Sequence, residues 1–375
     1  MLCADMSDDL SMSAPDLDEA DERAVLDALR SGVLGLGPFA ERFEALCARA
    51  AGTAHAVAVS SGTAGLHLIV RALGITRGDE VLVPSFTFAA SANAFIYEGG
   101  TPIFIDIDPE TFNLDPAEIS ARRTPDTRAV MVVDIFGQPA DWYAIEQTAT
   151  DLLLIEDSCE ALGAKYRGRP AGSFGRAGCF AFYPNKQVTT GEGGMIVTDD
   201  PALFQLCQSL RNQGRGEMGS WLNHERLGFN YRMDELSAAL GVSQIQRLDA
   251  ILAKRARVAE WYTHRLASLE WVRPPTIREE VDMSWFVYVV TLDRNIDRDS
   301  LVETLATRGV PSRAYFSPLH LQPYIRDRFG TREGMLPVTE DISRRTLALP
   351  FHNNITESQV DRVVRALENV GAARS

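Results

Sequence analysis

Short apolar runs alternate with stretches of helical spacing between residues 55 and 199. The apolar runs cover residues 55–61, 80–85, 101–108, 129–136, 151–157, 177–183 and 193–199. Runs this short and this uniformly apolar are typical of strands that are covered on both faces. Because helical stretches separate them, the pattern predicts an α/β fold with a largely parallel sheet wound by helices.

The segments on either side of this alternation have a different character. Residues 16–49 have helical spacing with a break at 31–38, and residues 232–269 form a long amphipathic helical region. A strand at 285–292 and helices at 298–309 and 356–370 follow. We therefore expect a disordered extension at 1–15, a large domain at 16–249 and a smaller α+β domain at 250–375.

Composition excludes several classes of function. The net charge of -14 argues against a nucleic-acid partner, since phosphate contacts need a basic face. The longest apolar windows, such as AVMVV and LLLI, are far shorter than the roughly 20 residues that span a bilayer, and the N-terminus is acidic. Five cysteines without a CxxC pair predict no disulfide framework and no metal site. We expect a cytoplasmic protein with no membrane partner.

The stretch VAVSSGTAGLHL, residues 57–68, places small hydroxyl residues and a glycine between a strand and a helix. The free amides at a helix N-terminus attract anions, and a glycine lets the backbone come close to a phosphate. Gly62 and Thr63 are therefore candidate phosphate ligands. Ordinary N-capping by Ser61 or Thr63 is the alternative that the local sequence leaves open.

An acid and a lysine complete a possible cofactor site. Asp157 ends an apolar run, where open α/β sheets bind their ligands, and Lys186 precedes a glycine-rich turn in CFAFYPNKQVTTGEGG. Each could be structural on its own: a carboxylate bonded to amides, or a solvated lysine. Together with the phosphate loop they form the set that pyridoxal phosphate (PLP) requires, namely a phosphate grip, a partner for the pyridine nitrogen and a reactive amine.

From about Leu17 to Val364 the chain resembles the DegT/StrS family of PLP-dependent nucleotide-sugar aminotransferases. The matching stretches are SSGTAGL, PSFTFAASANA, EDSCEALGA, FYPNKQVTTGEGG, LGFNYRMDELSAALG, YFSPLHLQP and LALPF. The resemblance implies the fold type I architecture of aspartate aminotransferase and a homodimer with shared active sites. Because Lys186 is present, whereas related sugar dehydratases carry histidine there, transamination is the implied activity.

The resemblance also implies the catalytic roles. Lys186 would bind the cofactor covalently and then move a proton between substrate and cofactor. Asp157 would pair with the pyridine nitrogen and strengthen the ring as an electron sink. Phe88 would stack on one face of the ring, with Cys159 close to the other. A core position for Phe88 is the alternative.

Three further positions follow from the resemblance or depart from it. Asn230 of GFNYR would reach the phosphate across the dimer, although this segment alone reads as a turn. Ala181 stands where many members have serine, so Ser60 or a water would replace a lost hydroxyl. Glu160 stands where many have glutamine or histidine near the cofactor's phenolic oxygen. We expect Glu160 to share a proton or to turn toward a cation.

The implied substrates are L-glutamate as amino donor and a nucleoside diphosphate keto-sugar as acceptor. The motifs are closest to members that aminate a 4-keto-6-deoxy sugar, such as perosamine synthases. The candidate substrate ligands are Arg211, Arg215, Arg232, Arg313 and His320, each with a surface or structural role as the alternative. Two other functions stay open: an aminotransferase for a keto-cyclitol in aminocyclitol biosynthesis, and a non-catalytic regulatory or binding protein with the PLP fold.

Overall fold

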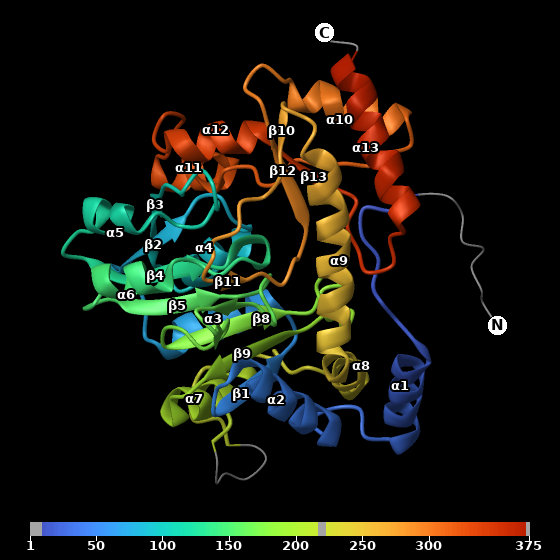
Figure 1. Ribbon diagram of the computed structural model, residues 1–375. Coiled ribbons are helices and arrows are strands. Elements are labelled where there is room, and N and C mark those ends of the chain that lie inside the picture. The colour runs from blue at the N-terminus through green and yellow to red at the C-terminus, as the bar shows by residue number, and fades with distance from the viewer. Residues whose placement is uncertain (1–9, 217–222, 373–375) are drawn as a thin grey trace.

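A seven-stranded sheet lies at the centre of the large part of the molecule (Figure 1). This computed structural model describes residues 10–216 and 223–372. In spatial order the strands are β1 (His55–Val59), β9 (Gly194–Thr198), β8 (Ala177–Ala181), β5 (Leu153–Asp157), β4 (Thr127–Val133), β2 (Glu80–Pro84) and β3 (Thr101–Ile105). Strand β9 is antiparallel to both neighbours, and the other pairs are parallel. Each predicted apolar run forms one strand, so the mostly parallel α/β fold is confirmed.

Helices cover both faces of this sheet. Alternate residues of each strand point to opposite faces, and apolar side chains lie on both. Val57 and Val59 pack in one apolar cluster with α3 (Gly62–Ala72), α4 (Ala89–Ile96) and α7 (Pro201–Arg211). Ala56 and Ala58 face the other side. The helices on that side are α2 (Pro38–Ala51), α5 (Pro116–Arg122), α6 (Trp142–Thr148) and α8 (Glu235–Gln246). The sheet is therefore buried throughout, as its apolar strands require.

A smaller antiparallel sheet carries the C-terminal part of the chain. Its strands, in order, are β10 (Val272–Arg273), β12 (Tyr288–Leu292) and β13 (Thr346–Leu349). It packs against α9 (Leu248–Leu266), α10 (Arg298–Thr307) and α13 (Glu357–Ala372). Figure 1 shows α9 running from beside α8 up to this sheet. The predicted domain boundary falls in the first turn of α9, and the division into two domains stays a prediction.

The remaining elements of the described chain connect or flank the two sheets. They are α1 (Glu19–Ser31), β6 (Lys165–Tyr166), β7 (Arg169–Pro170), β11 (Val281–Asp282), α11 (Pro323–Phe329), α12 (Pro337–Arg345) and two 3-10 turns, η1 (Ile135–Gly137) and η2 (Leu319–Leu321). Strand β11, which lies between β10 and β12 in the chain, pairs with β6 of the larger part. The two parts are therefore joined by strand pairing as well as by α9.

The long helical region predicted at 232–269 is two helices that meet at Arg247. The backbone there has φ -102° and ψ 9°, which interrupts the helix. The Arg247 guanidinium donates to the Asp16 carbonyl and to Asp21 Oδ2, at 2.6 Å and 2.7 Å. This junction thus fastens the start of the chain to α8 and α9.

Residues 10–15 differ from the expectation of disorder. Leu10 is buried in the core of the smaller sheet, and Phe351 N donates to the Met12 carbonyl at 3.0 Å. The apolar side chains of this segment explain the difference, because they cover core surface. Residues 1–9 of the predicted extension lie outside the described residues.

Candidate active site

A cavity of about 420 Å³ opens where the carboxyl ends of β1, β4, β5 and β8 meet the start of β9. Its lining residues are Ser61, Gly62, Thr63, Leu66, Thr87, Phe88, Ala90, Val133, Asp157, Cys159, Glu160, Ala181, Tyr183, Asn185, Lys186, Glu192, Gly193, Phe286, Tyr315 and Phe316. The carboxyl edge of a parallel sheet is where such folds bind ligands. The cavity brings together the predicted phosphate loop, acid and lysine.

The N-terminus of α3 forms one wall of the cavity. Ser61 caps this helix, since its Oγ accepts from Ala64 N at 3.1 Å and its carbonyl accepts from Gly65 N at 3.0 Å. Gly62 and Thr63 are the first two residues of α3 and line the cavity, and amides in this turn of a helix have no partner within the helix itself. The capping alternative and the anion site therefore coexist in one turn.

Gly62 is required by close packing beneath this loop. A Cβ at this position would lie 2.7 Å from Ala181 Cβ and 2.9 Å from Cys159 Sγ. Side chains do not approach each other that closely, so a larger residue would push the turn into the cavity. Ser61, rather than Ser60, contributes the hydroxyl residue at the cavity wall beside Ala181.

Asp157 is held at the end of β5 by a chain of hydroxyl groups. Ser91 Oγ donates to Asp157 Oδ2 at 2.7 Å, and Thr87 Oγ1 lies 2.9 Å from Ser91 Oγ. Cys159 N donates to Asp157 Oδ1 at 3.2 Å. The carboxylate is buried yet lines the cavity, so it is oriented for a cationic ligand group.

Lys186 lies in the loop that follows β8. Its amine is 3.5 Å from Glu160 Oε1 and 3.9 Å from the centre of the Phe286 ring. The side chain is 13% exposed, so it is not the solvated surface lysine of the alternative interpretation. An amine held between a carboxylate and an aromatic face, at a cavity wall, is placed for covalent chemistry.

Glu160 turns toward a cation, as expected. Burial raises the pKa of its carboxyl, although the charge of Lys186 acts in the opposite direction. Its second oxygen, Oε2, accepts from Phe136 N at 2.9 Å, and Phe136 has a left-handed backbone with φ 56°. Glu160 therefore joins Lys186 to the turn that follows β4.

Glu156, the neighbour of Asp157, faces the other side of the sheet. It accepts from the amides of Gly172 and Phe174 at 2.5 Å and 2.7 Å. Burial and the nearby Asp134 raise the pKa of its carboxyl well above the ordinary range. Glu156 is structural, in agreement with the alternation along the strand.

Phe88 and Cys159 both line the cavity but differ in exposure. Phe88 is 62% exposed, which is unusual for a large apolar residue and excludes the core alternative. Cys159 lies beneath Gly62, where a hydrogen bond with Cys179 and burial raise the pKa of its thiol well above the ordinary range. Cys159 is therefore a neutral packing group.

Asn230 does not line the cavity of its own chain. It is exposed, and its backbone pairs with that of Asn212 in an antiparallel bridge. This position is compatible with a contact to a second subunit, which stays a prediction.

The four candidate arginines also lie outside the cavity lining. Arg211 is buried and donates to Glu44 Oε1 and to the Ala58 carbonyl, at 2.5 Å and 2.7 Å. Arg232 donates to Asn212 Oδ1 at 3.1 Å, and Arg215 to Gln213 Oε1 at 3.2 Å. Arg313 is exposed, two residues from the lining residue Tyr315. The internal partners of Arg211 remove it from the candidates for substrate binding.

His320 is a structural residue, which corrects its assignment to substrate binding. The side chain is fully buried, with Nδ1 2.7 Å from Ser85 Oγ and Nε2 3.0 Å from Glu340 Oε1. Burial lowers the pKa of the imidazole. Both ring nitrogens are therefore used to join η2 and α12 to the end of β2.

Sequence reasoning missed several cavity residues. Thr87 lines the cavity next to Phe88, and Ser91, outside the lining, bonds to Asp157; both belong to the stretch PSFTFAASANA, so their closeness to a predicted site residue was an available signal. Tyr315 and Phe316 open the stretch YFSPLHLQP in the C-terminal part of the chain, which matched the family without giving either residue a role. Burial and the nearby Glu160 raise the pKa of Tyr315 to about 12, so its hydroxyl stays protonated at neutral pH.

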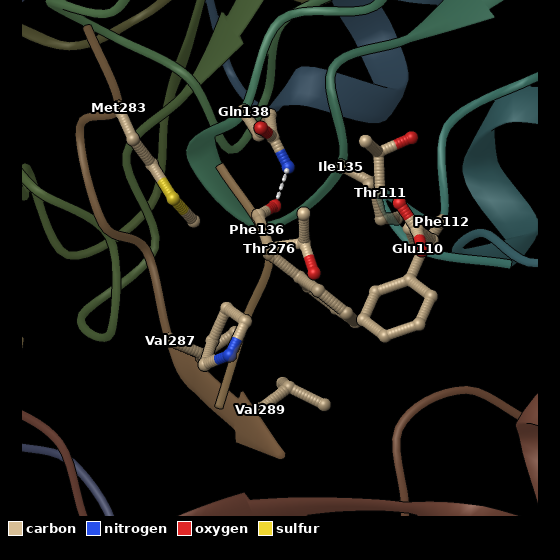
Figure 2. Close-up of a pocket in the computed structure, with 11 residues that line it drawn as sticks. Glu110, Thr111, Phe112, Ile135, Phe136, Gln138, Thr276, Met283, Val287 and Val289 are labelled. Atoms are coloured by element: carbon tan, nitrogen blue, oxygen red, sulfur yellow. Dashed lines mark hydrogen bonds between the residues drawn. The ribbon is translucent and has the colours of Figure 1, made fainter. Parts of the chain in front are cut away.

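A second, much smaller pocket lies on the far side of the Phe136 turn (Figure 2). Its volume of about 10 Å³ holds roughly one water molecule, too little for a substrate. Figure 2 shows the hydrogen bond that crosses it, from Gln138 Nε2 to the Thr276 carbonyl at 3.1 Å. This pocket is a packing defect between the two parts of the chain.

The donor set fits the expected cofactor. PLP needs an anion grip, a carboxylate and an amine, and the cavity offers the α3 amides, Asp157 and Lys186. Gly62 lets this turn pack directly on Ala181 and Cys159. Among residues 10–216 and 223–372, no cluster of histidine, cysteine or acidic side chains could hold a metal ion. Within the same ranges, no helix is long and apolar enough to span a membrane.

Comparisons with known proteins agree with this geometry. Residues 15–368 match the DegT/DnrJ/EryC1/StrS aminotransferase family. The GDP-perosamine synthase of Caulobacter vibrioides is 40% identical over 368 residues, covering 96% of this chain and 98% of that protein. DesV of S. venezuelae has a TM-score of 0.89 and 35% identity, over 96% of this chain and 98% of that one. The PLP form of Spr1654 from Streptococcus pneumoniae has a TM-score of 0.93 and 26% identity, over 97% and 99%. The chain therefore belongs to the DegT/DnrJ/EryC1/StrS aminotransferase family, whose members depend on PLP.

Proposed function

We propose that this sugar aminotransferase moves an amino group from L-glutamate to the keto group of a 4-keto-6-deoxy sugar carried on a nucleoside diphosphate. The observation that carries the catalytic part is the meeting of Lys186, Asp157 and the α3 N-terminus at one cavity. The 40% identity with a GDP-perosamine synthase supports the choice of sugar. The expected cytoplasmic location stays a prediction.

The protein's own groups divide the work of holding PLP. Lys186 Nζ would hold it covalently, the amides of Gly62 and Thr63 would bind its phosphate, and Asp157 would meet its pyridine nitrogen. Phe88 would cover the open face of the ring. When bound, PLP supplies an electron sink for the charge that develops on the carbon that carries the amine.

Proton transfer would also rest on Lys186. When it is not attached to PLP, Lys186 Nζ would take a proton from the substrate carbon and return it. Glu160 Oε1, 3.5 Å from this amine, would hold it in position and offset its charge. The hydrogen bond that Ser91 Oγ donates to Asp157 Oδ2 would orient this carboxyl group for the pyridine nitrogen.

We further propose a homodimer with shared active sites. Exposed apolar side chains on α1 and the loop after it support this, since such a group marks an interaction surface; they are Leu26, Leu29, Val33, Leu34 and Leu36. Asn230 would reach the phosphate of the partner's PLP. The substrate's diphosphate would meet the exposed Arg313 beside Tyr315, with Arg215 and Arg232 as further candidates.

The first experiment is the visible absorption spectrum of wild type and Lys186→Ala, each with PLP and with or without L-glutamate. We expect the wild type with PLP to show the visible absorption band of a covalently attached cofactor. Glutamate should bleach this band. Lys186→Ala should not attach PLP covalently. A wild type that binds PLP but does not respond to any amino donor would favour a non-catalytic binding protein instead.

A panel of acceptors tests the sugar. Wild type loaded with amine from glutamate should return to the starting spectrum with a 4-keto-6-deoxy sugar linked to a nucleoside diphosphate. The same sugar without its nucleotide is the matched control and should react far more slowly. Reaction with a nucleotide-free keto-cyclitol, and none with the nucleotide sugars, would overturn the proposal in favour of aminocyclitol synthesis.

A further inference from the structure

A buried histidine lies four residues after the phosphate-binding turn and contacts a different part of the chain. His67 of α3 is 5% exposed. Its Nδ1 is 3.2 Å from Tyr231 Oη and its Nε2 is 2.8 Å from Glu98 Oε1. Arg71 Nη1 donates to Glu98 Oε2 at 2.6 Å, which fixes the carboxylate. The imidazole is thus held on both sides.

Aromatic packing strengthens the contact with the segment that contains Tyr231. The Phe229 and Tyr231 rings stack on each other at 5.0 Å, with an angle of 14° between their planes. The centre of the His67 ring lies 4.8 Å from that of Phe229 and 5.9 Å from that of Tyr231. Two aromatic side chains two residues apart therefore lie on one side of this segment, against α3.

Asn230, which lies between Phe229 and Tyr231 in the sequence, is on the other face of this segment. Residues 230 and 232 pair in antiparallel bridges with Asn212 and Val59, so the segment is extended. Successive side chains of an extended chain lie on opposite faces. Asn230 is exposed, on the face away from His67. Because Tyr231 O also accepts from Ser60 N at 2.9 Å, the segment is bonded to the start of the phosphate loop.

We propose that His67 is a positioning residue for PLP binding: by holding Phe229 and Tyr231 on α3, it sets the angle at which Asn230 is offered to the phosphate in the partner subunit. This inference rests on the proposed function, in which Asn230 binds across the dimer. The same helix would then serve two phosphates, its own at its N-terminus and the partner's through Asn230.

The imidazole allows two matched variants. An asparagine at position 67 can place its amide near the former Nδ1 and retain the link to Tyr231, whereas a glutamine reaches the former Nε2 position and retains the link to Glu98. We expect His67→Gln to raise the dissociation constant of PLP about three- to tenfold, as for one lost hydrogen bond, and His67→Asn to raise it less. Tyr231→Phe, which keeps the ring stack, should resemble His67→Gln.

The test is a spectroscopic titration of PLP into each full-length variant, combined with Asn230→Ala. If His67 acts through Asn230, the two effects overlap, and His67→Gln adds little in the Asn230→Ala background. Urea unfolding without PLP verifies that each variant is folded. Equal PLP affinity in wild type, His67→Gln and Tyr231→Phe, or full additivity with Asn230→Ala, would overturn the inference. Failure of the proposed function is distinct, since wild type would then not attach PLP or would not respond to glutamate.

Discussion

The Lys186 amine lies 3.5 Å from Glu160 Oε1, and both side chains are nearly excluded from solvent. Burial raises the pKa of Glu160, while its contact with Lys186 favours the charged form. The ionised carboxylate can hold the amine in position, whereas the protonated acid does so more weakly. Activity should therefore depend on the ionisation of Glu160.

We expect the rate of the glutamate half reaction to fall as the pH decreases through the raised pKa of Glu160, above the ordinary value of 4.5 for this side chain. Glu160→Gln, which resembles the protonated acid, should lower the rate about 10- to 100-fold at neutral pH and remove this acidic limb. Stopped-flow absorbance across the pH range measures both. Glu303→Gln is the control, since Glu303 is exposed on α10 and lies outside the cavity lining. An unchanged acidic limb in Glu160→Gln would contradict the assignment.

Asp157→Asn should retain the shape of the site and lose its negative charge. We expect the half-reaction rate to fall about 100- to 1000-fold, as for loss of a preorganised charge, with PLP still attached to Lys186. Ser91→Ala removes one hydrogen bond to Asp157 Oδ2 and should cost about three- to tenfold. The two rates are measured at saturating PLP. Equal losses in both variants would mean that Ser91, and not the carboxylate charge, is the important group.

Much of this site could be predicted because its signals are local. The strands are short apolar runs, and Asp157 and the phosphate loop sit at the ends of such runs, where the topology of a parallel sheet places ligands. The sequence also indicates Lys186, because a lysine at the end of an apolar run is costly to bury unless its amine is paired or takes part in chemistry.

The remaining contacts join residues far apart in the sequence. His320 is bonded to Ser85, 235 residues earlier, so no local pattern distinguished a buried structural histidine from a substrate ligand. Tyr315 and Phe316 reach the cavity from beyond the smaller sheet's strand β12. The sequence likewise predicted a cation as one possible partner of Glu160, but it did not identify that cation as Lys186.

Gly62→Ala should reduce PLP affinity at least about tenfold without unfolding the protein, because its Cβ would lie 2.7 Å from Ala181 Cβ and push the phosphate turn into the cavity. Adding Ala181→Gly removes that contact and should restore part of the affinity. Ala181→Gly alone is the matched control that completes the double-mutant cycle. Titration of PLP measures all four proteins, and equal affinities for wild type and Gly62→Ala would contradict the proposed phosphate site.

His320→Gln should weaken the fold and leave the chemistry intact. The substitution leaves Ser85 Oγ without its ring partner, so we expect the free energy of unfolding to fall by about 1–3 kcal/mol at pH 8, measured by urea unfolding.

The stability that His320 contributes should depend on pH. Burial lowers the pKa of His320 in the folded protein below its ordinary 6.5. Between the lowered pKa and 6.5, the unfolded chain therefore binds a proton that the folded protein does not. The stability from neutral His320 is therefore present above pH 6.5 and is lost as the pH falls. The difference between wild type and variant should narrow from pH 8 to pH 5. His264→Gln, at an exposed position, should change stability by less than about 0.5 kcal/mol at every pH. A raised KM for the nucleotide sugar in His320→Gln, with unchanged stability, would instead return His320 to the substrate site.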